Sequence, residues 1–242
     1  SFMSDAFLRT ARVTERIYAD HPSATQVWGG VHCTIAPEEA IKHCKIVCQG
    51  EGDLALPEFV EKFSNDEDYT DVENFWFELP DGTVKSNPMR PLLVELDEMP
   101  WPDYEIDSHF ILDEGDIKPM DVELLEKHHN NAPLGFPTYP VLSSRGCAFR
   151  CSFCYNATYK QIFAGQKSVR FRNLIDVVDE LRSMKDRFPF FRSFFFSDDD
   201  FFLRSKKQLQ EFQGYAKEKI PDLLFDAWWG STATPASLSK DK

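Results

Sequence analysis

The sequence has 242 residues, 42% of them hydrophobic and 28% charged, which is the composition of a globular chain with one large or two modest cores and excludes a disordered one. The formal net charge of -13 disfavours binding to a nucleic-acid backbone. Without an apolar stretch near the roughly 18 residues of a membrane helix, or a secretory signal pattern, we expect a cytoplasmic protein without a membrane span.

The first part of the chain alternates helix and strand signals. Apolar periodicity and turn residues predict helices over 4–19, 38–43 and 56–63, and strands over 26–28 and 45–48. Such alternation is typical of an α/β fold with a doubly wound parallel sheet.

Residues 64–139 are acidic and contain many prolines, which is typical of a connector. Residues 75–77 and 83–84, separated by Pro80-Asp81-Gly82, predict one hairpin within it. We therefore expect domains over 1–65 and 140–242, joined by a linker over 66–139.

Alternation resumes after the linker. Strands are predicted over 141–144, 190–197 and 224–229, with helices over 173–188 and around Leu209 to Ile220 between them. Three strands and two helices in this order make half of a parallel barrel, whose functional loops follow the carboxyl ends of the strands.

The loop after the first of these strands contains Cys147, Cys151 and Cys154 in a C-x3-C-x2-C spacing. A loop of this kind can direct three thiolates at three irons of a cubane cluster and leave the fourth iron without a protein ligand. In a cytosolic chain, such packing of cysteines indicates metal or redox chemistry before disulfides.

Two other interpretations of the cysteines stay open. One is a small zinc site completed by His128 or His129, although zinc sites more often use paired C-x2-C knuckles from separate elements. The other is an electron-transfer cluster, which needs a fourth cysteine. The remaining ones, Cys33, Cys44 and Cys48, lie in the distant first half, where we expect small buried apolar residues.

The segment Ser143-Ser144-Arg145-Gly146-Cys147 leading into CAFRCSFC closely resembles the radical S-adenosylmethionine (radical SAM) enzymes. The resemblance implies that Cys147, Cys151 and Cys154 ligate a 4Fe-4S cluster and that S-adenosylmethionine chelates the fourth iron. An electron from the cluster would cleave the sulfonium to a 5'-deoxyadenosyl radical. Phe153 would pack near the adenine and the backbone of Tyr155 would meet its edge. An electron donor such as flavodoxin or ferredoxin is implied as partner.

Three consecutive carboxylates, Asp198 to Asp200, end the second predicted strand, and they repel each other unless solvent or a cation is close. The segment resembles the F-x-D-D-x-F of cobalamin-linked radical SAM enzymes, where Asp198 and Asp199 match and one of them would contact the methionine amine. A solvated loop or a helix cap is the alternative. At the third strand end, Ser231 is a candidate for holding the ribose by the same resemblance.

Two glycine loops in the first half, residues 27–34 and 48–53, resemble the G-G-x-H-x-T and G-E-G-[DE] loops of the cobalamin-binding domain in one radical SAM subgroup. Gly29 and Gly30 would border the nucleotide tail of the corrinoid. The D-x-H-x-x-G segment of that domain is not in the sequence, and His32 lies in a different motif. Without the resemblance, Gly29-Gly30 would be interpreted as a tight turn after a strand.

The sequence thus predicts an α/β chain with part of a doubly wound, Rossmann-like cobalamin-binding domain and the first half of a partial (β/α)6 radical SAM barrel, truncated at both ends. The expected reaction is cobalamin-linked methyl transfer, or radical cyclisation or rearrangement, of a small organic substrate. The alternatives are a non-catalytic corrinoid or iron-sulfur binding module and a zinc-stabilised structural protein.

Overall fold

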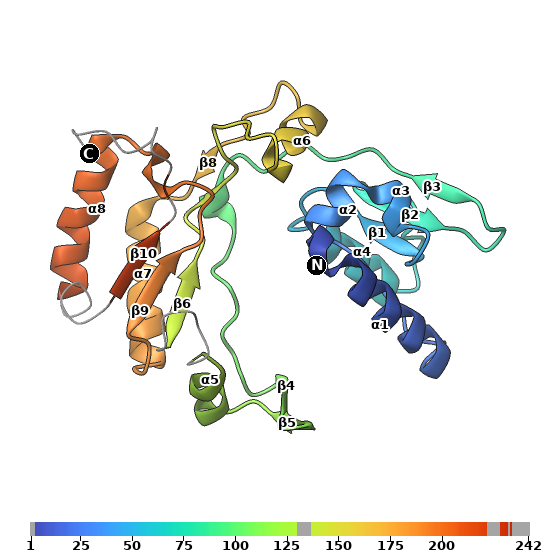
Figure 1. The fold of residues 1–242 in the computed structure, drawn as a ribbon, viewed down its shortest axis with the longest axis horizontal. Coiled ribbons are helices and arrows are strands. Elements are labelled where there is room, and N and C mark those ends of the chain that lie inside the picture. The colour runs from blue at the N-terminus through green and yellow to red at the C-terminus, as the bar shows by residue number, and fades with distance from the viewer. Residues whose placement is uncertain (1–2, 130–136, 222–227, 232, 234–242) are drawn as a thin grey trace. The chain divides into compact units, whose positions relative to one another are not determined.

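The computed structural model describes residues 3–129, 137–221, 228–231 and 233. The chain forms two compact units, each built from helices and strands (Figure 1). The first comprises Ser1–Leu93 and Phe149–Lys167, and the second comprises Val94–Ala148 and Ser168–Lys242. The α/β class agrees with the sequence prediction, whereas the division differs from the expected boundaries at 65 and 139. None of the described helices has the length and apolarity needed to cross a membrane.

The first unit places a small sheet among short helices. Its elements are η1 (Ser4–Ala6), α1 (Phe7–Asp20), α2 (Val31–Ile35), α3 (Pro37–Ala40), β1 (Ile46–Cys48), α4 (Ala55–Ser64), β2 (Phe75–Glu78), β3 (Val84–Ser86) and α6 (Tyr155–Ile162). The sheet order is β1-β2-β3 with antiparallel pairing, and one isolated parallel bridge joins Trp28 to Val47. Among the described strands of this unit, the predicted doubly wound parallel pairing is therefore limited to that bridge.

The predicted hairpin is present as β2 and β3, but it extends the sheet of the first unit instead of lying in a linker. Alternation in β2 places Phe75 and Phe77 on one face, where both are buried. Their rings stack on Phe59 of α4, with centroids 4.9 Å and 6.3 Å away. This aromatic packing explains why the hairpin joins the first core.

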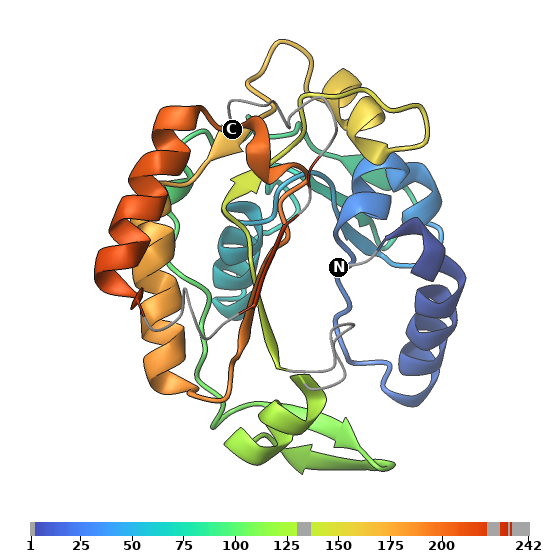
Figure 2. The same cartoon turned by 60° about the vertical axis from the view of Figure 1, so that its left-hand side comes forward.

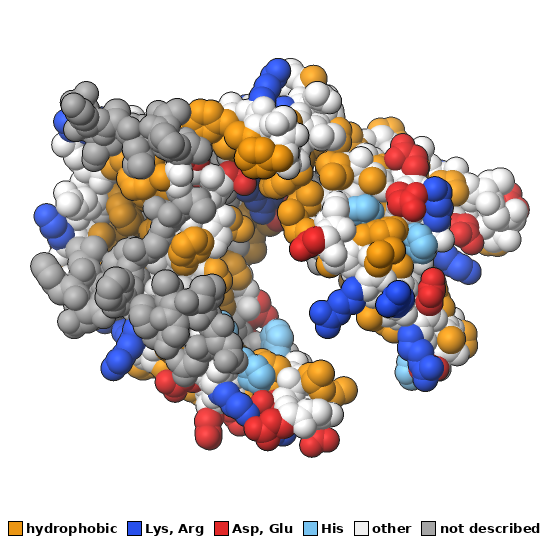
Figure 3. Space-filling view, viewed as in Figure 1, with side chains coloured by type: hydrophobic (Ala, Val, Ile, Leu, Met, Phe, Trp, Pro, Cys, Tyr) orange, Lys and Arg blue, Asp and Glu red, His pale blue; other side chains and the backbone are white. Residues whose placement is uncertain are grey.

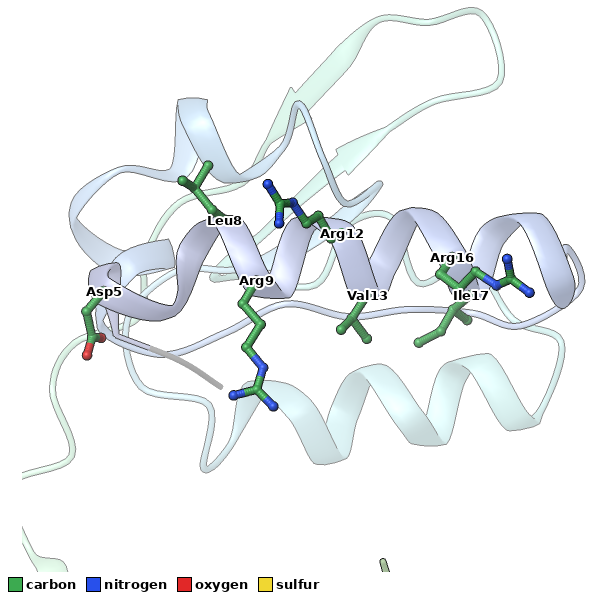
Figure 4. A pocket seen from close by; sticks show the side chains of 7 residues that line it. All are labelled: Asp5, Leu8, Arg9, Arg12, Val13, Arg16 and Ile17. Atoms are coloured by element: carbon green, nitrogen blue, oxygen red, sulfur yellow. The ribbon is translucent and has the colours of Figure 1, made fainter. Parts of the chain in front are cut away.

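Helix α1 covers the first unit with one face. Ala11 and Thr14 are buried, and the Thr14 hydroxyl accepts a hydrogen bond of 2.9 Å from Trp28 Nε1. The opposite face carries arginines between apolar residues and lines an open hollow (Figure 4). Helix α1 is thus amphipathic, as predicted for residues 4–19.

The second unit contains the parallel strands. Its elements are η2 (Leu96–Glu98), β4 (Phe110–Asp113), β5 (Asp116–Pro119), α5 (Val122–His129), β6 (Thr138–Val141), β7 (Ser144–Arg145), β8 (Arg170–Phe171), α7 (Leu174–Arg187), β9 (Ser193–Phe196), η3 (Phe201–Leu203), α8 (Lys206–Lys219) and β10 (Trp228–Ser231).

Strands β6, β9 and β10 form a parallel sheet in the order β10-β9-β6, with α7 and α8 as the connections (Figures 1 and 2). The predicted order of strands and helices is confirmed. For the third strand, predicted residues 224–227 lie outside the described residues, and β10 extends to Ser231. Closure into a barrel beyond these three strands stays a prediction.

Helix α7 anchors the core of this unit. The Asn173 side chain accepts a hydrogen bond from Ile175 N and caps the helix as predicted, and the stripe including Val177 and Leu181 is fully buried. One buried carboxylate interrupts the apolar packing: Glu180 accepts hydrogen bonds from the hydroxyls of Tyr104 (2.9 Å) and Tyr139 (2.7 Å). The core and its hydrogen bonds hold β6 and β9 in register, which positions the loops that follow them.

Candidate cluster and cofactor site

The three parallel strands end together. Val141, Phe196 and Ser231 are the last residues of β6, β9 and β10, and the register pairs both Val141 and Ser231 with Phe196. Because the carboxyl ends of parallel strands meet at one edge of a sheet, the segments that follow share that edge. The predicted acidic segment begins there, as does the approach to the cysteine loop, and Ser231 is placed beside them by its backbone.

The chain turns sharply just before the first cysteine. Gly146 has φ +80°, and a Cβ atom built on it would lie 2.0 Å from the backbone oxygen of Ser168. An L side chain is excluded by both conditions. Glycine is therefore required where β7 delivers the chain into the cysteine loop.

The cysteine loop passes from the second unit into the first. Cys147 is buried in the second unit, whereas Cys151 is exposed and Cys154 half-buried in the first. Within the described residues, no three Cys, His, Asp or Glu side chains are gathered so that they could hold a metal ion. Three thiolates brought together without a metal would repel each other. The donor set nevertheless fits an iron-sulfur cluster in kind, since it offers three thiol sulfurs in eight residues.

The residues after the second cysteine have clear local roles. Phe153 has 92% of its surface exposed, so no core contact competes with the predicted packing on a ligand. Cys154 is the N-cap of α6 and Tyr155 its first residue. The Tyr155 ring lies edge-on to Tyr159, with centroids 6.4 Å apart. The adenine contacts predicted for Phe153 and Tyr155 stay predictions.

The three consecutive aspartates occupy three different environments. This separation reduces the mutual repulsion expected from the sequence. Asp198 is 1% exposed and accepts hydrogen bonds from the hydroxyls of Ser143 (2.9 Å) and Ser144. Asp199 is exposed. Asp200 is buried and caps η3 by accepting from Phe202 N at 3.0 Å.

Arg204 is a buried residue of this strand-end network that the sequence analysis missed. Its side chain is 1% exposed and donates to the backbone oxygen of Ser143 at 2.5 Å and to the Ser143 hydroxyl at 2.9 Å. A second guanidinium nitrogen lies 3.9 Å from Asp198 Oδ1. The guanidinium also lies over the rings of Phe171 and Phe201, 4.8 Å and 4.9 Å from their centroids.

Burial lowers the pKa of Arg204 to about 10, and the nearby Asp198 carboxylate opposes that shift. Asp198 and Arg204 together fasten the exit of β6 to the exit of β9. A sequence signal for Arg204 was absent, because one arginine six residues after Asp198 looks like any surface cation.

The two predicted glycine loops meet in the first unit. The Thr34 hydroxyl donates to the oxygen of Gly30 at 2.9 Å and accepts from Gly50 N at 3.1 Å. Gly30 has φ +101°, which favours glycine, whereas a Cβ atom at Gly29 would make only ordinary contacts. His32, which lies between Gly30 and Thr34 in the sequence, is buried, and its Nδ1 lies 3.0 Å from Ser4 Oγ. Thr34 therefore joins loops that the sequence analysis singled out separately.

The other cysteines behave as predicted. Cys33, Cys44 and Cys48 are all buried. Burial raises the pKa of Cys33 to about 12 and that of Cys48 to about 11. These thiols remain protonated at neutral pH, so they are poor metal ligands and nucleophiles.

The histidines considered for zinc have other partners. His128 Nε2 lies 3.0 Å from Asp113 Oδ1, and His129 Nδ1 lies 2.9 Å from the backbone oxygen of Leu125. The contacts tie α5 to the β4-β5 hairpin. The zinc alternative would have to break them.

Known proteins resemble both halves of the chain. Residues 141–223 match the family model of the radical SAM superfamily. An uncharacterized methyltransferase from Pyrococcus horikoshii is 28% identical over 212 residues, which cover 86% of this chain and 40% of that protein. The bacteriochlorophyllide d C-12(1)-methyltransferase of Chlorobaculum tepidum is 28% identical over 194 residues, covering 78% and 33%.

Solved structures give the same result for the fold. The radical SAM methyltransferase TsrM from Kitasatospora setae, solved with tryptophan substrate and a SAM analogue, superimposes with a TM-score of 0.64 at 19% identity, over 96% of this chain and 41% of that one. The same enzyme has been solved with cobalamin and a [4Fe-4S] cluster bound. Residues 141–223 thus match a radical SAM domain, and the chain has a fold similar to that of solved cobalamin-dependent radical SAM enzymes.

Proposed function

We propose that the protein is a cytoplasmic, cobalamin-dependent radical SAM enzyme that transfers a methyl group to a small organic substrate. The observation that carries the proposal is the cysteine motif inside the matched domain, which follows β6 and β7 along the chain, while β6 ends at the same sheet edge as β9 and β10. The methyltransferase names of the similar proteins support methyl transfer. Because the chain spans 40% or less of the length of those relatives, the activity is proposed for the whole protein.

In this proposal Cys147, Cys151 and Cys154 hold a 4Fe-4S cluster, which when bound supplies the electron that cleaves S-adenosylmethionine. Gly146 provides the turn into the loop. Asp198, through the serine hydroxyls before that turn, fixes where the loop begins. The protein's task is to hold the reacting groups in line and keep water out.

The environments of the two candidate aspartates assign them different tasks. The Asp198 carboxylate is buried and already accepts hydrogen bonds from two hydroxyls, so it is a positioning residue. Asp199 is exposed at the same strand end and would meet the methionine ammonium of S-adenosylmethionine. Asp199→Asn should therefore weaken S-adenosylmethionine binding without lowering stability, measured by equilibrium binding to the cluster-loaded protein. Unchanged binding would remove Asp199 from the site.

For the corrinoid, Gly29 and Gly30 would lie along the nucleotide tail, and the bound corrinoid would carry the methyl group. The positive φ of Gly30 and its hydrogen bond from Thr34 hold backbone, not a side chain, at that place. Retention of cobalamin on a desalting column, and its loss in Gly30→Val, would test this assignment.

The charge around the cysteine loop supports an acidic electron donor such as flavodoxin or ferredoxin. Residues 145–172 contain six arginines and lysines and no Asp or Glu, in a chain of net charge -13. Two of the six face inward, since Arg170 is buried and Arg172 pairs with Asp176 and Glu180. Arg150 and Lys167 are exposed, and Figure 3 shows cationic and apolar side chains over the region of α6. Reduction by such a carrier should slow as ionic strength rises, because exposed charges are screened within about 8 Å at 0.15 M salt. A salt-independent rate would argue against this partner.

Anaerobic reconstitution with iron and sulfide, followed by assay for 5'-deoxyadenosine, tests the proposal as a whole. We expect product from the parent protein and none from Cys151→Ala. A cluster that forms but cleaves no S-adenosylmethionine would favour the binding module. Zinc without iron or sulfide would favour the structural protein.

A further inference from the structure

One polar side chain next to the cysteine loop is not used by the proposed chemistry. Asn156 is the second residue of α6 and is 4% exposed. Its amide nitrogen Nδ2 donates to the sulfur of Cys154 over 3.6 Å. A hydrogen bond to sulfur at this distance is of ordinary length, since sulfur is a larger acceptor than oxygen.

The helix start adds to this donor. Cys154 is the N-cap of α6, and its backbone oxygen accepts from Ala157 N at 3.1 Å. The amino end of a helix carries partial positive charge, which favours a negative group at the cap. The Cys154 sulfur thus accepts from an amide donor, and its residue stands at the positive end of a helix dipole, although its side chain makes no capping hydrogen bond.

Helix α6 is held so that the amide cannot swing away freely. Its end is fixed by Phe163, which is 3% exposed and lies close to Gly50, where a Cβ atom would come within 3.3 Å of its ring. Gln166 Oε1 accepts from Leu92 N at 2.7 Å. All these residues belong to the first unit, so one body carries both the donor and the acceptor.

We propose that Asn156 raises the reduction potential of the cluster by donating an N–H···S hydrogen bond to the Cys154 thiolate. This inference rests on the proposed function, because it takes Cys154 as a cluster ligand. Reduction adds one electron from a one-electron carrier to the cluster, without making or breaking a covalent bond. Negative charge on the cluster and its sulfurs then grows, and a hydrogen-bond donor stabilises the reduced state more than the oxidised one.

The test is an EPR-monitored redox titration of the reconstituted protein with Asn156→Leu, which keeps the approximate shape and removes the donor. We expect a tenfold shift of the equilibrium against reduction, which is about 59 mV to more negative potential for a one-electron couple. Gln161→Leu is the matched control: it places the same side chain on an exposed position of α6 and should leave the potential unchanged.

An Asn156→Leu potential equal to that of the parent would overturn the proposal. If that variant takes up no cluster, Asn156→Ala removes the donor without adding a charge, and its potential must fall below the parent's. Failure of both variants to hold a cluster would also contradict us, since Asn156 would then help to hold the cluster instead of tuning it. A parent that assembles no cluster would defeat the proposed function itself, and a parent that assembles one without cleaving S-adenosylmethionine would defeat only the catalytic part.

Discussion

Removing the Asp198 carboxylate should destabilise the second unit strongly, whereas removing its neighbour Asp199 should not. Asp198→Ala removes the carboxylate that faces the guanidinium of Arg204, whose side chain is only 1% exposed. It also removes the acceptor of the hydrogen bonds donated by the hydroxyls of Ser143 and Ser144. Removing one partner of a buried charge pair typically lowers the free energy of unfolding by about 3–5 kcal/mol. An exposed substitution such as Asp199→Ala usually stays within about 0.5 kcal/mol.

The measurement is urea unfolding of cluster-free protein, followed by circular dichroism, so that cofactor binding does not contribute. A double-mutant cycle with Arg204→Met isolates the pair. Because the two residues share the Ser143 hydroxyl, the double variant should cost about 1–3 kcal/mol less than the sum of the single ones.

Two outcomes would refute the reasoning. An Asp198→Ala cost under about 1 kcal/mol would mean that the carboxylate is not part of a buried pair. Strict additivity with Arg204→Met would mean that the two side chains act independently, and their common attachment to Ser143 would carry no energy.

Two further predictions follow from burial and backbone geometry. In cluster-free protein at pH 8.5, iodoacetamide should label the exposed Cys151 well before Cys33, because burial raises the pKa of the Cys33 thiol to about 12 and keeps it protonated. Peptide mass spectrometry gives the order of labelling, and early labelling of Cys33 would contradict the buried core. Gly146→Ala should lower the free energy of unfolding by at least about 2 kcal/mol, measured by thermal unfolding, because its Cβ would meet Ser168 O. Gly165 has φ +84° and open space around it, so Gly165→Ala should lower the free energy of unfolding only by the roughly 1–2 kcal/mol of the backbone strain that it introduces.

Local signals predicted α7 and α8 of the second unit well, whereas α5 lies in the expected linker and was not predicted. The apolar stripe of α7 and its Asn173 cap lie within one element, so neighbours in sequence determine them. Strand β6 was less predictable: it spans Thr138–Val141, three residues before the expected segment, and includes Pro140. The sheet order places β6 at an edge, where the missing N–H of a proline is tolerated.

The buried network at the strand ends could not be predicted, because its members meet from distant parts of the chain. Ser143 and Arg204 are 61 residues apart, and their contact depends on the register between β6 and β9. A fully buried arginine also runs against the average behaviour of charged residues. Composition and spacing therefore indicated where the cysteine motif lies, but not what holds it in place.

The different fates of Asp198 and Asp199 do have a local cause. Side chains of a strand alternate between its two faces, and in β9 Phe194 and Phe196 are buried while Phe195 is half-buried. The alternation continues past the end of the strand, since Ser197 is exposed, Asp198 buried and Asp199 exposed. Three consecutive phenylalanines concealed this period in the sequence, because an apolar run fits a strand buried on both faces equally well. Once the register is known, the same alternation that packs the phenylalanines directs one aspartate toward Arg204 and its neighbour toward solvent, so their different burial follows from the strand itself.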